Sequence, residues 1–248
     1  MKRSELLTLV TGGEFPDFHS TVCLIRKDGR FILVDTGHES DAGIVLDQLA
    51  GHGIRPEQID TVVLTHFHID HVANLGLFRP QVIYMGEADF DTSLQLVEAI
   101  DDSERLGQIL AASTHSLSDR SLAGLARMFR AHRTSIQQLM PFRDRIVALR
   151  TAVEVLPGVS IVPAPGHTRG QLVVWHGQEP STCIASDAIP SRAVTDVSSP
   201  VGRYFNFDDA AFREAISQIL GRADRVVPGH DTAFDVSRVI ERNGVIND

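Results

Sequence analysis

The feature that most constrains this chain is the run HFHIDH at residues 66–71, which holds three imidazoles and one carboxylate in six positions. An extended segment places His66 and His68 on the same side, whereas a helix would spread residues two apart around its circumference. Imidazole nitrogen and carboxylate oxygen are ligands for zinc, and they also suit iron or manganese. The run therefore predicts a metal-binding loop that connects a strand to a helix.

Three further residues with metal-ligand side chains occur later in the chain. His167, Asp187 and His230 each follow a short apolar run typical of a strand, and each lies at a turn marked by Gly or Asp. Residues in loops at the ends of strands can converge on one point of a fold. The sequence therefore predicts that these three side chains join the run at residues 66–71 in one centre.

This pattern resembles the metallo-β-lactamase superfamily, and the resemblance covers nearly the whole chain. It implies two divalent metal ions, expected to be Zn²⁺, with Fe or Mn as alternatives. The implied ligands are His66, His68 and His167 for the first ion, Asp70, His71 and His230 for the second, and Asp187 as the bridge between them. Asp70 and Asp187 are the expected catalytic residues. Two such ions lower the pKa of a shared water enough to present hydroxide at neutral pH, so the implied activity is hydrolysis.

The order of apolar runs along the chain predicts an α/β fold. Helices are expected near residues 44–50, 72–77, 208–220 and 236–240, where the spacing or the flanking residues favour them. The expected strands cover residues 6–10, 20–25, 31–34, 61–64, 82–85, 153–156, 159–162, 172–175, 182–185 and 225–227. The resemblance implies that these elements form the four-layer αβ/βα sandwich of the superfamily, as a single domain over residues 1–248.

Residues 87–150 interrupt the strand pattern with a helical insertion. Apolar residues recur there with helical spacing, as Leu122, Leu125 and Phe129 do, so two or three helices are expected. Both ends of the insertion adjoin the predicted centre, which favours a lid that shapes substrate choice; the alternative is a dimer interface. Its arginines predict either a solvated, salt-bridged face or a contact with an anionic substrate group. They include Arg120, Arg127, Arg130, Arg133, Arg143, Arg145 and Arg150.

The bulk composition argues against several classes of protein. A formal net charge of -9 disfavours a nucleic-acid partner, because phosphate binding is driven by basic surface. Neither an export signal nor a membrane span is predicted, since the apolar run at residues 6–10 is short. Cys23 and Cys183 lie in apolar runs and are expected to be reduced core residues of a cytoplasmic protein. The expected partner is a small-molecule substrate with an apolar tail or an anionic group, and a homodimer is a further option.

Within the superfamily, the segments around the histidines select the expected activity. Val72 to Gly76 and the closing segment Pro228 to Asp231 look most like lactonase-like hydrolases, including quorum-quenching acyl-homoserine lactonases. Those lactonases commonly carry a Tyr three residues after the bridging Asp. This chain has Pro190 there, so Tyr84 or Tyr204 would have to replace that Tyr. The alternatives are a thioesterase of the glyoxalase II type, a phosphodiesterase or nuclease of the same superfamily, and a non-catalytic binding protein.

Several residues near the predicted centre have more than one interpretation. Asp35 ends a strand, and it either supports a metal-binding His or caps a helix. Thr168 and Ser186, each beside an implied ligand, are either supporting residues or turn residues. His19 and His38 lie in loops and are interpreted as solvent-exposed.

Overall fold

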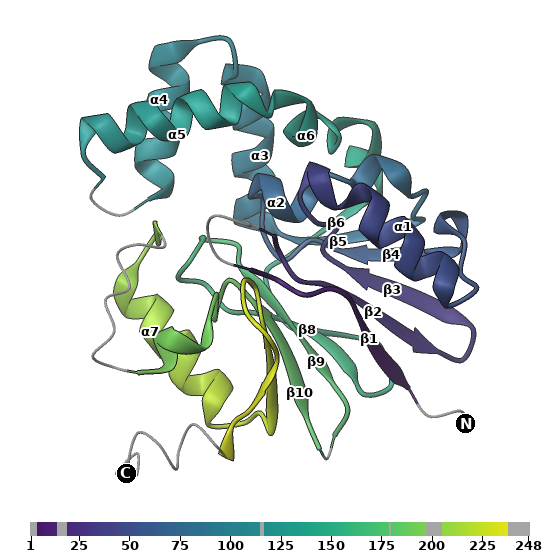
Figure 1. Cartoon of the computed structure of the whole chain (residues 1–248). Coiled ribbons are helices and arrows are strands. Elements are labelled where there is room, and N and C mark those ends of the chain that lie inside the picture. Colours follow the sequence, from purple (N-terminus) through teal and green to yellow (C-terminus); the bar gives the residue numbers. More distant parts are fainter. Residues whose placement is uncertain (1–3, 14–18, 115–116, 179, 197–204, 238–248) are drawn as a thin grey trace.

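The structure is a computed structural model that describes residues 4–13, 19–114, 117–178, 180–196 and 205–237. Within these ranges the chain forms two six-stranded sheets and seven α-helices. The sheets face each other, and the helices lie on their outer sides (Figure 1). The predicted α/β class and the αβ/βα sandwich are therefore confirmed.

The first sheet begins as an antiparallel meander and continues with parallel strands. Across the sheet the strands are β1 (Glu5–Val10), β2 (Val22–Lys27), β3 (Arg30–Val34), β4 (Thr61–Val63), β5 (Val82–Gly86) and β6 (Ile146–Leu149). Asp28 and Gly29 turn the chain between β2 and β3 with φ angles of 48° and 81°, the backbone that a tight hairpin turn requires. From β3 onward the strands are parallel, so their carboxyl ends lie at one edge of the sheet.

Helices connect the parallel strands. The earlier ones lie along the outer face of the first sheet, and the later ones stack beyond them at one end of the molecule (Figure 1). In chain order the helices are α1 (Ala42–Gly51), α2 (Ile69–Val72), α3 (Glu87–Ala99), α4 (Ser103–Ser113), α5 (Asp119–Ala131) and α6 (Arg133–Gln137). Short 3-10 turns lie at Glu39–Asp41, Pro56–Gln58, Leu75–Leu77 and Met140–Arg145. The buried apolar side chains of these helices and of the sheet form one cluster. It also contains Phe67 and Phe78 from the loops, together with Phe129 of α5.

The insertion differs from its prediction in two respects. Its described part holds four helices, α3 to α6, where two or three were expected. Helix α3 shows little apolar periodicity because two of its four buried residues, Asp89 and Ser93, are polar. The strand β6 also lies within residues 87–150, where it pairs with β5. All four of its residues are apolar and Val147 is 42% exposed, so the segment lacks the alternation that marks a strand.

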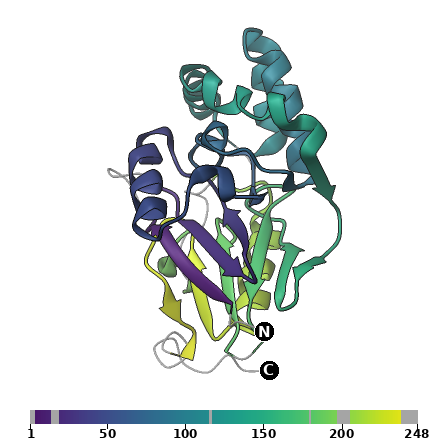
Figure 2. The same ribbon diagram turned by 90° about the vertical axis from the view of Figure 1, so that its right-hand side faces the viewer.

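The insertion lies at one end of the molecule, away from the N-terminus (Figure 2). Several of its arginines pair within the chain: Arg130 donates to Ser103 Oγ at 2.6 Å, and Arg133 lies 3.4 Å from Asp101. These contacts support the salt-bridged face over a contact with substrate. None of the helices in the described ranges has the length and apolar character that spanning a bilayer would require.

The second sheet is mostly antiparallel. Across it the strands are β12 (Phe234–Asp235), β11 (Arg225–Pro228), β10 (Thr182–Ser186), β9 (Leu172–His176), β8 (Val159–Pro163) and β7 (Val153–Leu156). The strands β10 and β11 are parallel, so a crossover has to connect them. A 3-10 turn at Arg192–Thr195 and helix α7 (Asp209–Leu220) lie in that crossover. The helix expected at residues 236–240 lies mostly outside the described residues.

The inner faces of the two sheets bury a shared apolar core. Cys23 and Ile25 of the first sheet belong to one cluster with Ile161 and Val174 of the second. Cys23 and Cys183 are both free, and both are fully buried in strands, which confirms their prediction as core residues. Because this core joins the two sheets, it fixes the edge at which their loops meet.

Candidate metal centre

The histidine run lies where β4 passes into α2. His68 is the residue before the helix, which begins at Ile69. The predicted strand-to-helix loop is therefore observed. The helix expected at residues 72–77 is wrong in its bounds: the α-helical turn covers Ile69–Val72 and so includes Asp70 and His71, and a separate 3-10 turn follows at Leu75–Leu77. The α-helical turn directs the side chains of Asp70 and His71 into the interior, where they are buried.

The other three predicted residues come from loops of the second sheet. His167 lies between β8 and β9, Asp187 directly follows β10, and His230 follows β11. The structure brings all seven predicted residues together in two groups, and the ligand atoms within each group lie within 4.8 Å of one another. The groups are His66, His68, His167 and Asp187, and Asp70, His71 and His230.

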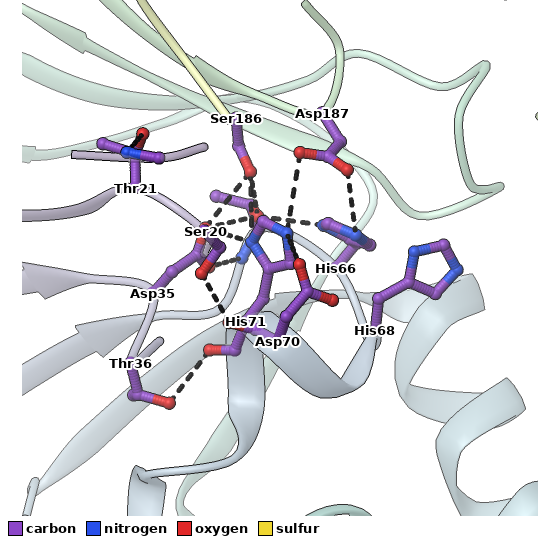
Figure 3. A network of polar contacts seen from close by, with 12 residues as sticks. Ser20, Thr21, Asp35, Thr36, His66, His68, Asp70, His71, Ser186 and Asp187 are labelled. Atoms are coloured by element: carbon purple, nitrogen blue, oxygen red, sulfur yellow. Dashed lines mark hydrogen bonds and ion pairs between the residues drawn. The ribbon is translucent and has the colours of Figure 1, made fainter. Parts of the chain in front are cut away.

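Asp187 contacts both groups. Its Oδ2 lies 3.4 Å from His167 Nε2 and 3.2 Å from His230 Nε2, and its Oδ1 lies 3.6 Å from His71 Nε2. Figure 3 shows the carboxylate facing His66 and His71. A carboxylate in this position can contribute one oxygen to each group, as a bridging ligand does.

Four of the seven side chains have a buried ligand atom without a hydrogen-bond partner among the described residues. A buried polar atom that stays unpaired destabilises a fold by about 1–3 kcal/mol. Imidazole nitrogens and carboxylate oxygens at this spacing suit a divalent cation, so the residues present fit the metal ions that the resemblance implies. The atoms are Nε2 of His66, Oδ2 of Asp70, Nε2 of His71 and Oδ1 of Asp187.

Burial keeps the histidines of the first group neutral. It is the main reason that the pKa of His66 lies well below its ordinary value, and His71 and His68 lower it further. Burial also lowers the pKa of His68 to about 3, with His167 adding to the effect. The pKa of His167 is lowered by burial as well. A neutral imidazole has a free lone pair, which is the form that binds a metal.

Carboxylates govern the second group. Burial acts to lower the pKa of His71, but Asp70, Asp35 and Asp187 together raise it well above its ordinary value. Burial also acts to lower the pKa of His230, but Asp187 raises it to about 9. Carboxylates that draw protons onto neighbouring imidazoles would draw a divalent cation for the same reason, and binding would release those protons.

Asp35 supports the centre through hydrogen bonds to His71 and to residues beside the ligands. Its Oδ2 accepts a hydrogen bond from His71 Nδ1 at 2.8 Å, and its two oxygens accept from the backbone N–H and the hydroxyl of Thr65 at 2.8 Å each. Ser186 Oγ donates to it at 3.2 Å. Metal-binding imidazoles usually donate their second N–H to such a group. The structure therefore favours support over helix capping, since the next helical turn begins four residues later.

Two other ligand histidines also have a partner for their second nitrogen. His230 Nδ1 lies 2.9 Å from the carbonyl oxygen of His19, and His167 Nδ1 lies 3.2 Å from Asn206 Oδ1. No local pattern marks Asn206, which lies 39 residues after His167. His19 and His38, interpreted as solvent-exposed, are partly exposed, and each also contacts other residues. The ring of His19 contacts the buried Asp41, and His38 caps a 3-10 turn.

Asp89 of α3 clamps the loop that carries His167. Its Oδ2 accepts from Thr168 Oγ1 and its Oδ1 accepts from the backbone N–H of Gly170, both at 2.7 Å. A Cβ atom at Gly170 would lie 2.6 Å from the backbone nitrogen of Asp89, so the helix and the loop are in direct contact. Thr168 is thus a supporting residue. Asp89 is missed by sequence reasoning, because nothing in the insertion distinguishes it from a surface carboxylate.

Comparisons with solved structures show similarity of the fold. A solved N-acyl homoserine lactone hydrolase, with N-hexanoyl-L-homoserine bound at its catalytic metal centre, has a TM-score of 0.58 and 16% identity. The match covers 85% of this chain and 80% of that one. At this identity the likeness shows the shared fold.

Sequence comparisons identify the family. Metallo-beta-lactamase domain-containing protein 1 of Mus musculus is 48% identical over 211 residues, which cover 84% of this chain but only 62% of that protein's length. A probable metallo-hydrolase of Methanocaldococcus jannaschii is 32% identical over 200 residues, or 81% of this chain and 70% of that protein. The family model of the Metallo-beta-lactamase superfamily matches residues 16–85. With this fold, these relatives and this ligand arrangement, the chain belongs to the metallo-β-lactamase superfamily.

Proposed function

We propose that this chain is a metal-dependent hydrolase that opens an ester or a lactone. The observation that carries the proposal is the set of seven converging His and Asp side chains, four of which have a buried ligand atom without a hydrogen-bond partner among the described residues. Two bound divalent ions would polarise a substrate carbonyl and lower the pKa of water, which makes hydrolysis possible at neutral pH. The proposed ligands are His66, His68 and His167 for one ion, Asp70, His71 and His230 for the other, and Asp187 in common.

Two aspartates have further roles in the proposed reaction. Oδ2 of Asp70 lies 3.2 Å from His71 Nε2 and 3.4 Å from His230 Nε2. Burial opposes ionisation of Asp70, but these two histidines hold its pKa below the ordinary range. It is therefore a carboxylate at neutral pH in the metal-free protein. Its proposed role as acceptor of the proton that the attacking water gives up rests on its place among the ligands. Asp187 keeps the two groups of ligands in register, since its oxygens contact both.

A lactone as substrate is the finer part of the proposal. It is supported by the resemblance of residues 72–76 to lactonase-like hydrolases and by the fold shared with a solved lactone hydrolase. Pro190 stands where a lactonase Tyr is expected, and its carbonyl accepts from the backbone N–H of His230 at 2.6 Å. Tyr84 packs against the core between the sheets, so it does not replace that Tyr, and Tyr204 lies outside the described residues. A different donor would have to orient the lactone carbonyl.

We also propose that the insertion shapes substrate choice. Phe67 of the histidine run packs against Phe129 of α5, with ring centroids 6.3 Å apart, and Asp89 of α3 holds the loop of His167 in place. The large apolar residues of α4 to α6 mostly pack inward with the first sheet. This inward packing supports a role at the site over the alternative role as a dimer interface.

The test is a metal count combined with a substrate panel. Protein purified without added metal should hold about two equivalents, since the centre has two ligand groups, with zinc as the predicted metal. It should hydrolyse lactones in preference to thioesters, phosphodiesters and β-lactams. His52→Ala, at an exposed histidine outside the centre, is the matched control. Fully loaded protein that hydrolyses none of the panel would refute the proposal. The single-domain organisation and the cytoplasmic location stay predictions.

A further inference from the structure

Three more ligand side chains gather outside the centre. His38, Glu39 and His132 offer ligand atoms that lie within 4.8 Å of one another. Nδ1 of His132 lies 3.3 Å from Glu39 Oε1, and the centroids of the His38 and His132 rings lie 5.7 Å apart. None of the three belongs to the seven-residue centre, so the proposed hydrolysis does not account for their approach.

The nitrogen of His132 indicates a ligand rather than an ordinary ion pair. Its Nδ1 is buried and has no hydrogen-bond partner among the described residues, although the Glu39 carboxylate is close. An exposed ion pair contributes only about 0–1 kcal/mol. A buried nitrogen without a hydrogen bond destabilises by about 1–3 kcal/mol, so the pair alone does not explain the arrangement. A cation held between the two side chains would satisfy both.

The geometry of His38 is compatible with the same ion. Its Nδ1 accepts a hydrogen bond from the backbone N–H of Ser40 at 3.2 Å and lies 2.8 Å from Ser40 Oγ. A cation bound at Nε2 would move the ring proton to Nδ1, where Ser40 Oγ can accept it. Metal-binding histidines usually have such an oxygen partner on their second nitrogen. The carbonyl oxygen of His38 accepts from Asn74 Nδ2 at 2.6 Å, and its ring caps the turn Glu39–Asp41. The bond from Asn74 therefore holds the backbone of His38 in place before any ion binds, whereas the bond from the Ser40 N–H to the ring would be given up on binding.

We propose that His38, Glu39 and His132 form an additional surface site for a divalent transition-metal ion such as Zn²⁺. Two imidazoles and one carboxylate are an established zinc ligand set, which leaves a fourth position for water. His38 and Glu39 belong to the turn after β3, whereas His132 joins α5 to α6 in the insertion. An ion bound there would tie the insertion to the first sheet and so stabilise α5 and α6 independently of the hydrolytic centre.

The test is a Zn²⁺ titration of the full chain by calorimetry, after the hydrolytic centre has been filled. The unsubstituted protein should bind one further ion and melt at a higher temperature. His132→Ala and Glu39→Gln should each weaken this step by at least tenfold, because the loss of even a supporting contact typically costs about 10–100-fold in metal affinity. His52→Ala, which removes an exposed histidine elsewhere, should leave the step unchanged.

Two controls keep the outcome decisive. Each variant should retain the metal content of the hydrolytic centre and its turnover, which shows that the fold is intact. Glu39→Gln preserves side-chain size and serves alone if His132→Ala does not fold. The proposal is overturned if the unsubstituted protein shows no further binding step, or if the step persists in the folded variants.

Discussion

The buried carboxyl group of Asp89 should make the stability of this chain depend on pH, and Asp89→Asn should remove that dependence. The side chain is 1% exposed. Burial raises its pKa from 3.8 to about 7, although hydrogen bonds from Thr168, Gly170 and Phe67 act in the opposite direction. The native fold therefore prefers the protonated acid, whereas the unfolded chain ionises near the ordinary pKa.

The sign and the size of the effect follow from this shift. A pKa that is raised in the folded state contributes stability that is fully present below the unfolded value of 3.8 and is lost as the pH rises through about 7. Integrating proton binding between about pH 5 and about pH 8 gives a loss of about 2–3 kcal/mol from this one group. An asparagine side chain has a similar shape and does not titrate, so the variant should lack this loss.

The assay is urea denaturation of both proteins at several pH values, with saturating metal throughout. Other titrating groups act equally on both proteins, so they cancel in the difference between the two free energies of unfolding. That difference should shift by about 2–3 kcal/mol in favour of Asp89→Asn as the pH rises. Asp91→Asn, at an exposed position of the same helix, should run parallel to the unsubstituted protein. Parallel curves for Asp89→Asn as well would refute the reasoning.

Further substitutions test the centre itself. Asp187→Ala and His68→Ala should each lower the rate of hydrolysis by roughly 100-fold or more while the circular dichroism spectrum stays unchanged. Loss of a residue that binds the metal directly should reduce activity more than loss of a supporting residue, which typically costs about 10–100-fold. Near-normal turnover with full metal content would contradict these roles. Asp35→Ala should lower metal affinity by about 10–100-fold in a competition titration with a chelator, since it removes the acceptor of two neighbouring side chains. Gly229→Ala should lower turnover by roughly 100-fold, because its Cβ would overlap Asp187 Oδ1; Gly107→Ala, with nothing within 4 Å of the added atom, is its control.

The convergence of the seven His and Asp side chains could be predicted because most of them have a local signal beside them. The run at residues 66–71 is contiguous, and His167 and His230 each follow a Pro-Gly pair at the end of an apolar run. The supporting contacts have no such signal. Asp89 bonds to Gly170 across 81 residues and His167 contacts Asn206 across 39. Contacts over these separations depend on the fold and leave no periodicity in the sequence.

For the fold as well, the sequence predicts the elements with a local signal and misses those that depend on distant contacts. Strands in the middle of each sheet are buried on both sides and appear as apolar runs, which a sequence shows clearly. Two of the four edge strands are harder: β12 has two residues, and β6 is four apolar residues with partial exposure. Such short segments become strands only because a neighbouring strand offers hydrogen bonds. Tertiary pairing therefore decides these elements.

Among the described residues each sheet is contiguous in the sequence, and the chain passes from one sheet to the other once, through the exposed residues 150–152 between β6 and β7. Four of the proposed ligands precede this crossing and three follow it. If the protein were cut there, or expressed as two fragments, each fragment would contain all the strands of one sheet. Neither fragment would contain either of the two ligand groups in full. Fragment association and metal affinity would then be thermodynamically linked, so added metal should drive the two fragments to reassemble. The chain is thus a natural candidate for a split reporter whose signal depends on metal concentration.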